Sequence, residues 1–128
     1  MKAKRPKRYN FPDSPEDSAY QLFPDVLEND PNVFFHGTAA SNLTSIIRNG
    51  FRATKKLCSV SFVTTSPVAL KYACDSRGTP PQDGVVIAVR FDDLTILEYS
   101  GDVVHLHDLT KQPQIIGTCV VPADYKFR

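Results

Sequence analysis

The stretch FFHGTAASNLTSIIRNGF, residues 34–51, carries the clearest local pattern in this sequence of 128 residues. An aromatic run with β propensity ends at His36 and Gly37, and a short amphipathic helix follows it. The helix is indicated by a candidate N-cap, an apolar stripe at helical spacing and a glycine suited to the position after the last turn: Ser41, then Leu43, Ile46 and Ile47, then Gly50. A histidine at such a strand end either packs in a core or contacts a ligand, so its neighbours must decide which.

The surrounding chain predicts a second helix and a strand-rich second half. We expect a strand over residues 59–64 and a helix over residues 66–73, with Ser66 as N-cap and Pro67 at the first helical position. One face of this helix carries Val68, Ala69, Tyr72 and Ala73. Further strands are expected over residues 85–91, 95–99, 103–107 and 114–121. Two early helices and several late strands with short links predict an α+β domain on a small antiparallel or mixed sheet.

Residues 1–32 differ from the rest in composition, so we divide the chain into a Pro-rich, charged N-terminal arm (1–32) and a domain (33–128). The first eight residues contain five Lys or Arg and no acid, although the formal net charge of the chain is only +1. Within the arm, a short helix is possible over residues 17–23. A basic arm can hold a phosphate-rich partner such as nucleic acid, but it is more often a solvated terminus.

Cysteine usage and hydropathy bound the setting of the protein. The three cysteines are widely spaced and form no CxxC motif, which argues against a disulfide framework and fits a reducing compartment. No apolar run approaches the roughly 18 residues of a spanning helix, and the basic start lacks the apolar stretch of a signal peptide. We therefore expect a monomeric, cytoplasmic or otherwise intracellular protein with no membrane partner.

Beyond these patterns, the order of short motifs is informative. Aromatic-His-Gly-Thr, an apolar helix, NGF, a strand with SF, and a helix that begins Ser-Pro and ends KYA follow one another before the late strands. Over about residues 33 to 125, this series resembles the ADP-ribosyltransferase superfamily, in the branch shared by diphtheria-type toxins and poly(ADP-ribose) polymerases. The resemblance implies a small split antiparallel sheet with two or three short helices. It also implies NAD as substrate, with no metal, and transfer of ADP-ribose to a protein or nucleic-acid acceptor after the nicotinamide–ribose bond is cleaved.

The resemblance assigns roles in NAD binding to residues of the first strand and the second helix. His36 matches the histidine that hydrogen-bonds a ribose hydroxyl, and the backbone of Gly37, beside Thr38, matches the part that holds the nicotinamide carboxamide. Tyr72 matches the aromatic residue on which nicotinamide stacks. The alternative, that Tyr72 simply packs in the core, has equal weight from the sequence.

The second motif position combines features of two branches of the family. Ser61 stands where this branch has a tyrosine, and Phe62 follows it. Ser59 and Ser61 form a Ser-x-Ser strand, which is similar to the branch whose motif begins with Arg. Either Phe62 supplies an aromatic wall for NAD or Ser61 makes a polar contact, and the sequence leaves both open.

The third motif position falls on Gln114, where the family has a catalytic glutamate. The resemblance thus gives His36, Ser61 and Gln114 as the catalytic set, with Gln112 two residues earlier. A carboxylate there would orient the ribose and face the positive charge that develops at the transition state, whereas an amide can only hydrogen-bond. An acid from elsewhere in the chain, such as Glu98 or Asp102, could substitute, without a motif to support either.

Three other interpretations remain open. The same pocket could bind NAD, ADP-ribose or a nucleotide without chemistry. An RNA 2′-phosphotransferase-like activity would use the His-Gly-Thr strand end together with arginines such as Arg48, Arg52 and Arg90. In a pure interaction domain, His36 would merely shape a turn. A zinc site at His105 and His107 is not expected, because no third ligand lies at useful spacing.

Overall fold

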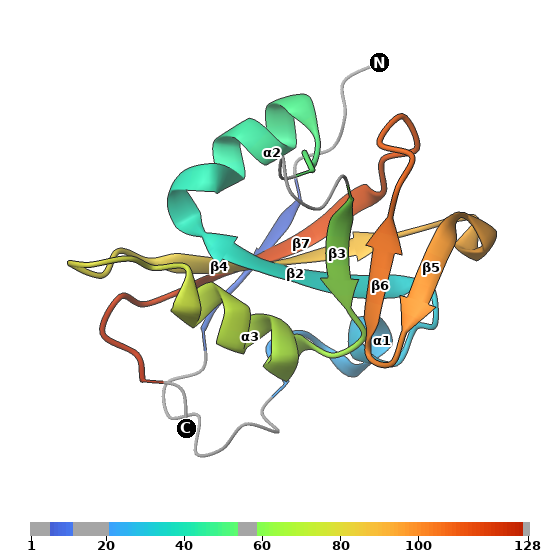
Figure 1. Cartoon of the computed structure of the whole chain (residues 1–128). Coiled ribbons are helices and arrows are strands. Elements are labelled where there is room, and N and C mark those ends of the chain that lie inside the picture. Colours follow the sequence, from blue (N-terminus) through green and yellow to red (C-terminus); the bar gives the residue numbers. More distant parts are fainter. Residues whose placement is uncertain (1–5, 12–20, 54–58, 127–128) are drawn as a thin grey trace.

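The computed structural model describes residues 6–11, 21–53 and 59–126 (Figure 1). Within these ranges, seven strands form one sheet in the order β1-β7-β4-β2-β3-β6-β5. The strands are β1 (Lys7–Tyr9), β2 (Val33–Ala39), β3 (Val60–Val63), β4 (Gly84–Arg90), β5 (Leu97–Ser100), β6 (Val103–Leu106) and β7 (Gln114–Val121). The helices are α1 (Asp25–Glu28), α2 (Leu43–Asn49) and α3 (Ser66–Asp75), with 3-10 turns η1 (Ala40–Asn42) and η2 (Leu94–Ile96).

This architecture confirms the predicted α+β class on an antiparallel or mixed sheet, and the sheet is mixed, unlike the split antiparallel sheet that the resemblance implies. Strand β1 pairs with β7 in parallel, from Lys7 opposite Gly117 to Tyr9 opposite Cys119, while the other pairs are antiparallel. A parallel neighbour needs a long connection rather than a hairpin, and nearly the whole chain separates β1 from β7. The prediction missed β1 because it lies in the charged arm.

The described parts of the arm pack into the domain core. The side chains of Leu22, Phe23 and Leu27 are at most 9% exposed and belong to the same core cluster as Phe35. Most of the helix considered for residues 17–23, namely residues 17–20, lies outside the described residues. Residues 21–32 therefore contribute to the hydrophobic core together with the domain.

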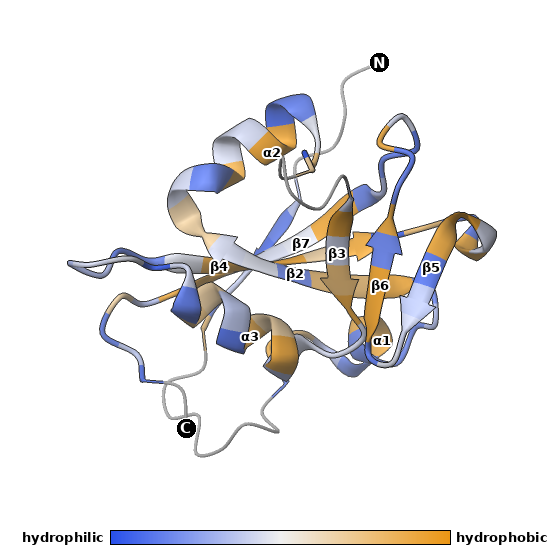
Figure 2. Cartoon of the chain, viewed as in Figure 1, coloured by the Kyte–Doolittle hydropathy of each residue, from blue (hydrophilic) through white to orange (hydrophobic). Residues whose placement is uncertain are grey.

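The central strands are rich in hydrophobic residues, as the colouring in Figure 2 shows, and these residues belong to two core clusters. One cluster lies under α1 and α3 and includes Phe35, Leu70 and Val86. The other lies on the opposite face, toward α2, and includes Phe62 and Ile87. A strand buried on both faces reads as a continuous apolar run, which explains the sequence GVVIAV in β4.

Helix α3 lies very close to β2 because glycine occupies the contact. A Cβ on Gly37 would stand 2.0 Å from the carbonyl oxygen of Ala69 and 2.7 Å from the backbone nitrogen of Ala73. Gly84 of β4 faces the same helix, since its Cβ would lie 2.8 Å from the Ala73 carbonyl oxygen. The small residues of both elements thus fix the position of α3 on the sheet.

The sheet is continuous but weakly joined between β2 and β3. Strand β2 pairs with β4 along its whole length, from Val33 to Ala39, but meets β3 only where Phe35 lies opposite Val63. In Figure 1, strands β3, β6 and β5 run across the direction of β2, β4 and β7. The two parts of the sheet diverge from that single contact.

Two helix starts differ from the prediction. Ser41 lies inside η1 instead of capping α2, which begins at Leu43. Ser66 is the first residue of α3, with Thr65 as its N-cap, and its hydroxyl is buried and bonded to Glu28. Gly50, with φ +82°, ends α2 as expected. Among the described residues, no helix has the length and apolar character needed to cross a membrane.

Candidate functional site

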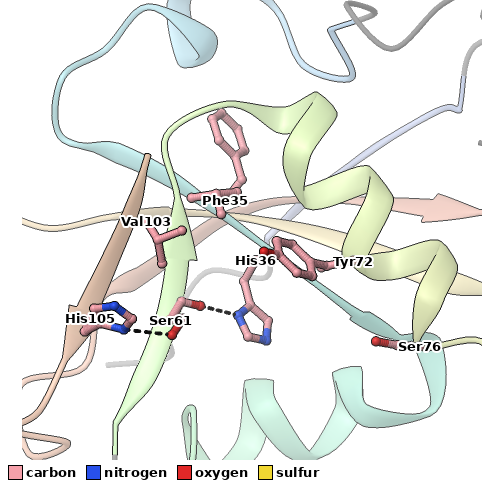
Figure 3. Close-up of a pocket in the computed structure, with 9 residues that line it drawn as sticks. Phe35, His36, Ser61, Tyr72, Ser76, Val103 and His105 are labelled. Carbon is pink, nitrogen blue, oxygen red and sulfur yellow. Dashed lines mark hydrogen bonds between the residues drawn. The ribbon is translucent and has the colours of Figure 1, made fainter. Parts of the chain in front are cut away.

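A pocket of about 410 Å³ opens where β2 and β3 diverge beside α3 (Figure 3). Its polar lining residues are His36, Ser61, Tyr72, Ser76 and His105, and the rest of the lining is Phe35, Gly37, Val63 and Val103. Of the seven site residues that the sequence suggested, His36, Gly37, Ser61 and Tyr72 therefore meet here. They come from β2, β3 and α3, which are separate elements of the chain.

His36 is held in a defined orientation by the neighbouring strand. Its Nδ1 lies 2.8 Å from the carbonyl oxygen of Ser61, and since a carbonyl only accepts, Nδ1 carries the proton in this contact. Burial lowers the pKa of His36, although the hydrogen bond to Ser61 opposes this effect. The rings of Phe51 and Phe62 lie edge-on or tilted against the imidazole, at 5.1 and 5.6 Å between ring centroids. A neutral His36 with Nδ1 protonated leaves Nε2 as a hydrogen-bond acceptor.

Ser61 also binds a second histidine, which the sequence analysis did not assign to the site. Ser61 and His105 lie opposite each other on β3 and β6, and Ser61 Oγ is 2.9 Å from His105 Nδ1. Figure 3 shows both hydrogen bonds converging on Ser61, one from each imidazole. The sequence signal for His105 is the His-x-His pattern of residues 105–107, which suggests only a possible zinc motif. Its place in the pocket follows from the pairing of β6 with β3, which the local sequence does not indicate.

Tyr72 lies at the pocket and is not a core residue. Its side chain is 48% exposed, while Leu70 and Ala73 of the same helix are fully buried. The alternative that Tyr72 packs in the core is therefore wrong. An exposed tyrosine ring beside a pocket can stack on a planar heterocycle.

The remaining residues suggested for NAD binding have other surroundings. Phe62 is fully buried in the core cluster toward α2, where its ring contacts that of His36, and it is not among the residues that line the pocket. The hydroxyl of Thr38 accepts a hydrogen bond of 2.9 Å from Asn42. Gly37 does line the pocket, but the close approach of α3 already requires a glycine at this position.

Gln114 is not near His36, so the expected catalytic set does not assemble. It begins β7, two strands from β2, and pairs with Arg90, which in turn pairs with Val33. Two strand spacings and three residues along the sheet separate it from His36, or about 14 Å between backbones. Gln114 instead lines a second hollow of about 410 Å³ with Gln112 and Arg90. Adjacency of strands in space, which the sequence did not reveal, decides this outcome.

Gln112 has a structural role of its own. Its side-chain oxygen accepts from the backbone N–H of Phe51 at 2.8 Å, and its Nε2 donates to the carbonyl oxygens of Phe51 and Leu109 at 3.0 and 2.9 Å. The residue thus ties the end of α2 to the loop before β7. Through Phe51 it also supports the ring that packs against His36.

Within residues 6–11, 21–53 and 59–126, no carboxylate lines the pocket. The closest in register is Glu98 of β5, directly opposite His105, but its side chain is 65% exposed and lies 3.3 Å from His107 Nε2. Arg48, Arg52 and Arg90 also lie outside the lining, and Arg90 is bonded to Asp30 at 2.9 Å. Among the residues that the structure describes, the phosphate-binding arginines that a 2′-phosphotransferase would need thus do not line this pocket.

Metal and thiol chemistry have little support in the described part of the chain. There, no three His, Cys, Asp or Glu side chains gather closely enough to hold a metal ion. Cys119 is buried, and burial raises the pKa of its thiol to about 12, so it is a poor nucleophile. Cys58 lies outside the described residues.

The basic arm is described only in part. Lys2, Lys4 and Arg5 fall outside the described residues, whereas Lys7 and Arg8 are exposed on β1. Lys7 Nζ lies 5.3 Å from the centre of the Tyr9 ring. Of the five basic residues expected to form a phosphate-binding arm, the described ones are therefore Lys7 and Arg8, both exposed on the edge strand β1.

Comparison with known proteins adds no assignment. No protein-family model matches the chain, and no curated protein matches it. Any function for the pocket must therefore be argued from its own residues.

Proposed function

We propose that the chain is an ADP-ribosyltransferase-like domain that binds the nicotinamide riboside half of NAD in the pocket between β2, β3 and α3. The observation that carries the proposal is the convergence of His36, Gly37, Ser61 and Tyr72 on one pocket. The same four residues match an NAD-binding motif by sequence resemblance. A sheet whose halves diverge at Phe35 and Val63 is consistent with the split sheet of that family.

Each polar group has a task in this proposal. His36 Nε2 accepts a hydrogen bond from a ribose hydroxyl, because Nδ1–H is already used on Ser61. The ring of Tyr72 stacks on nicotinamide, and the backbone of Gly37 approaches its carboxamide. Cleavage of the nicotinamide–ribose bond would then allow transfer of ADP-ribose to an acceptor.

A second candidate is a binding module that holds NAD or ADP-ribose without chemistry. It is favoured by one observation, that no carboxylate of the described part of the chain lines the pocket. A transition state with developing positive charge gains most from an opposing negative charge. Both candidates share the same ligand and differ only in turnover.

Calorimetric titration with NAD, followed by an assay of the same sample for free nicotinamide, tests both candidates. We expect binding in the wild type, a loss of about tenfold in affinity for Tyr72→Ala, and near-normal affinity for Tyr72→Phe. Tyr99→Ala is the matched control, since Tyr99 is 54% exposed on β5 and outside the pocket.

The outcomes separate the candidates. Binding with nicotinamide release supports the transferase, and binding without release supports the module. If the wild type fails to bind at about 1 mM NAD, or if Tyr99→Ala weakens binding as much as Tyr72→Ala, the pocket is not an NAD site.

A further inference from the structure

We propose that His105, held by Ser61, accepts the proton of a hydroxyl group on the incoming acceptor. This inference rests on the proposed transferase function and names the group that would replace the missing carboxylate in the chemical step. His105 then touches the acceptor, while Ser61 positions both imidazoles.

The geometry around Ser61 carries the inference. Its carbonyl oxygen holds His36 at 2.8 Å and its hydroxyl holds His105 at 2.9 Å, both through Nδ1. Because residues opposite each other on antiparallel strands share a face, Ser61 and His105 lie side by side on the pocket face of the sheet. When His105 Nδ1–H donates to Ser61 Oγ, its Nε2 keeps a free electron pair. A base whose orientation is set by a partner is the arrangement that general-base catalysis requires.

The surrounding charges favour His105 over other candidates. Glu98 on β5 lies opposite His105 but is mostly exposed and bonded to His107, just beyond β6. Across the pocket, the titratable side chains of the described residues that face His105 are His36 of β2 and Tyr72 of α3, and no Lys, Arg, Asp or Glu of the described ranges lines it. His36 is already assigned to the ribose, which leaves His105 as the available base.

The proposed step balances with NAD and a hydroxyl acceptor alone. The acceptor oxygen forms a bond to ribose C1 while the C1–N bond to nicotinamide breaks, and the electron pair of that bond leaves with neutral nicotinamide. The acceptor proton passes to His105 Nε2. The imidazolium then returns this proton to solvent before the next turnover.

Nicotinamide release, measured with water and with added methanol as acceptors over a range of pH, tests the inference. In the wild type we expect methyl ADP-ribose to form with methanol, at a rate that rises with pH, as general-base catalysis requires. His105→Asn retains a donor near the place of Nδ1 but no base, so its rate should fall by about 10²–10⁴-fold and lose the rising limb. Its NAD affinity in calorimetry should remain near that of the wild type.

His107→Gln is the matched control, because His107 is 53% exposed and lies outside the pocket lining. Ser61→Ala is a second variant, and it should lower the rate while leaving a shifted pH dependence, since the base is still present but less well oriented. Thermal unfolding of each variant shows whether a lost rate reflects a lost fold.

Three results would overturn the inference. The first is NAD binding with nicotinamide release that His105→Asn leaves unchanged, and the second is a rising limb that persists in that variant. The third is NAD binding with no release to water or methanol. A wild type that does not bind NAD at all would instead defeat the proposed function itself.

Discussion

At the scale of single residues, Gly37 is determined by packing before it is determined by any ligand. A Gly37→Ala side chain would meet two backbone atoms of α3 at 2.0 and 2.7 Å, and backbone cannot swing aside as a flexible side chain can. We expect the free energy of unfolding to fall by about 3 kcal/mol, at the upper end of the cost of overpacking. Urea denaturation measures this change.

Gly78→Ala provides the comparison for Gly37→Ala. Gly78 has φ +81° and open space around its Cβ position, so only backbone strain of about 1–2 kcal/mol should appear. Equal stability of the wild type and Gly37→Ala would mean that α3 does not lie as close to β2 as described. Because any side chain at position 37 would disturb the packing of α3, a Gly37 variant is a poor probe of NAD binding.

The two glutamines near the start of β7 should behave differently on truncation. Gln112 makes three hydrogen bonds with backbone groups of Phe51 and Leu109, so Gln112→Ala should cost about 1–2 kcal/mol of unfolding free energy. Gln114 is exposed, so Gln114→Ala should stay within about 0.5 kcal/mol. Thermal or urea unfolding of both variants checks the difference, and equal effects would contradict the role given to Gln112.

At the scale of elements, the start of α3 is tied to the segment before β2 through a buried network. Ser66 Oγ donates to Glu28 at 2.6 Å and accepts from the backbone N–H of Leu22 at 3.1 Å. Ser66→Ala leaves both groups without this partner in a buried site, so we expect a loss of about 1–3 kcal/mol. Ser45→Ala on the exposed side of α2 is the control, and a Ser66→Ala variant as stable as that control would contradict the network.

The same elements show what local sequence could and could not predict. Strand β7 matches the prediction residue for residue, and α2 ends at the expected Gly50. Both signals are local, because an apolar run with β propensity marks the strand and a glycine that tolerates positive φ marks the helix end. The sequence predicts Ser66 as the N-cap, because a serine hydroxyl at a helix start commonly bonds a backbone N–H of its own helix. The partner it actually binds, Glu28, is 38 residues away, and no local pattern indicates such a contact.

At the scale of the whole molecule, sheet order decides which site residues meet. The resemblance groups His36, Ser61 and Tyr72, and these three residues of β2, β3 and α3 do line one pocket. It failed for Gln114 and overlooked His105, because both depend on which late strand pairs with β3. Strand β6 takes that place, and β7 lies on the other side of β4. A single sequence therefore does not predict this part of the site, because its local patterns do not indicate which distant strands pair.

The fold as a whole should also respond to the protonation of His36. Burial lowers its pKa in the folded state, so for pH values between the folded and unfolded pKa the unfolded chain binds more protons. The stabilising contribution of neutral His36 is therefore fully present above the unfolded value of about 6.5 and is lost as the pH falls toward the folded pKa. Three aspartates, Asp30, Asp93 and Asp108, have pKa values lowered by hydrogen bonds from the residue two positions later, so their contribution is lost only at more acidic pH.

Urea unfolding at about pH 7.5 and about pH 5.5 should thus show the wild type losing stability within the range where histidine titrates. His36→Gln cannot gain that charge, so its unfolding free energy should change less between the two conditions. His107→Gln, at an exposed position, should keep the full wild-type dependence. If His36→Gln loses as much stability as the wild type on acidification, the imidazole is not shielded from water between Phe51 and Phe62. The neutral acceptor at Nε2, on which ribose recognition depends, would then lose its physical basis.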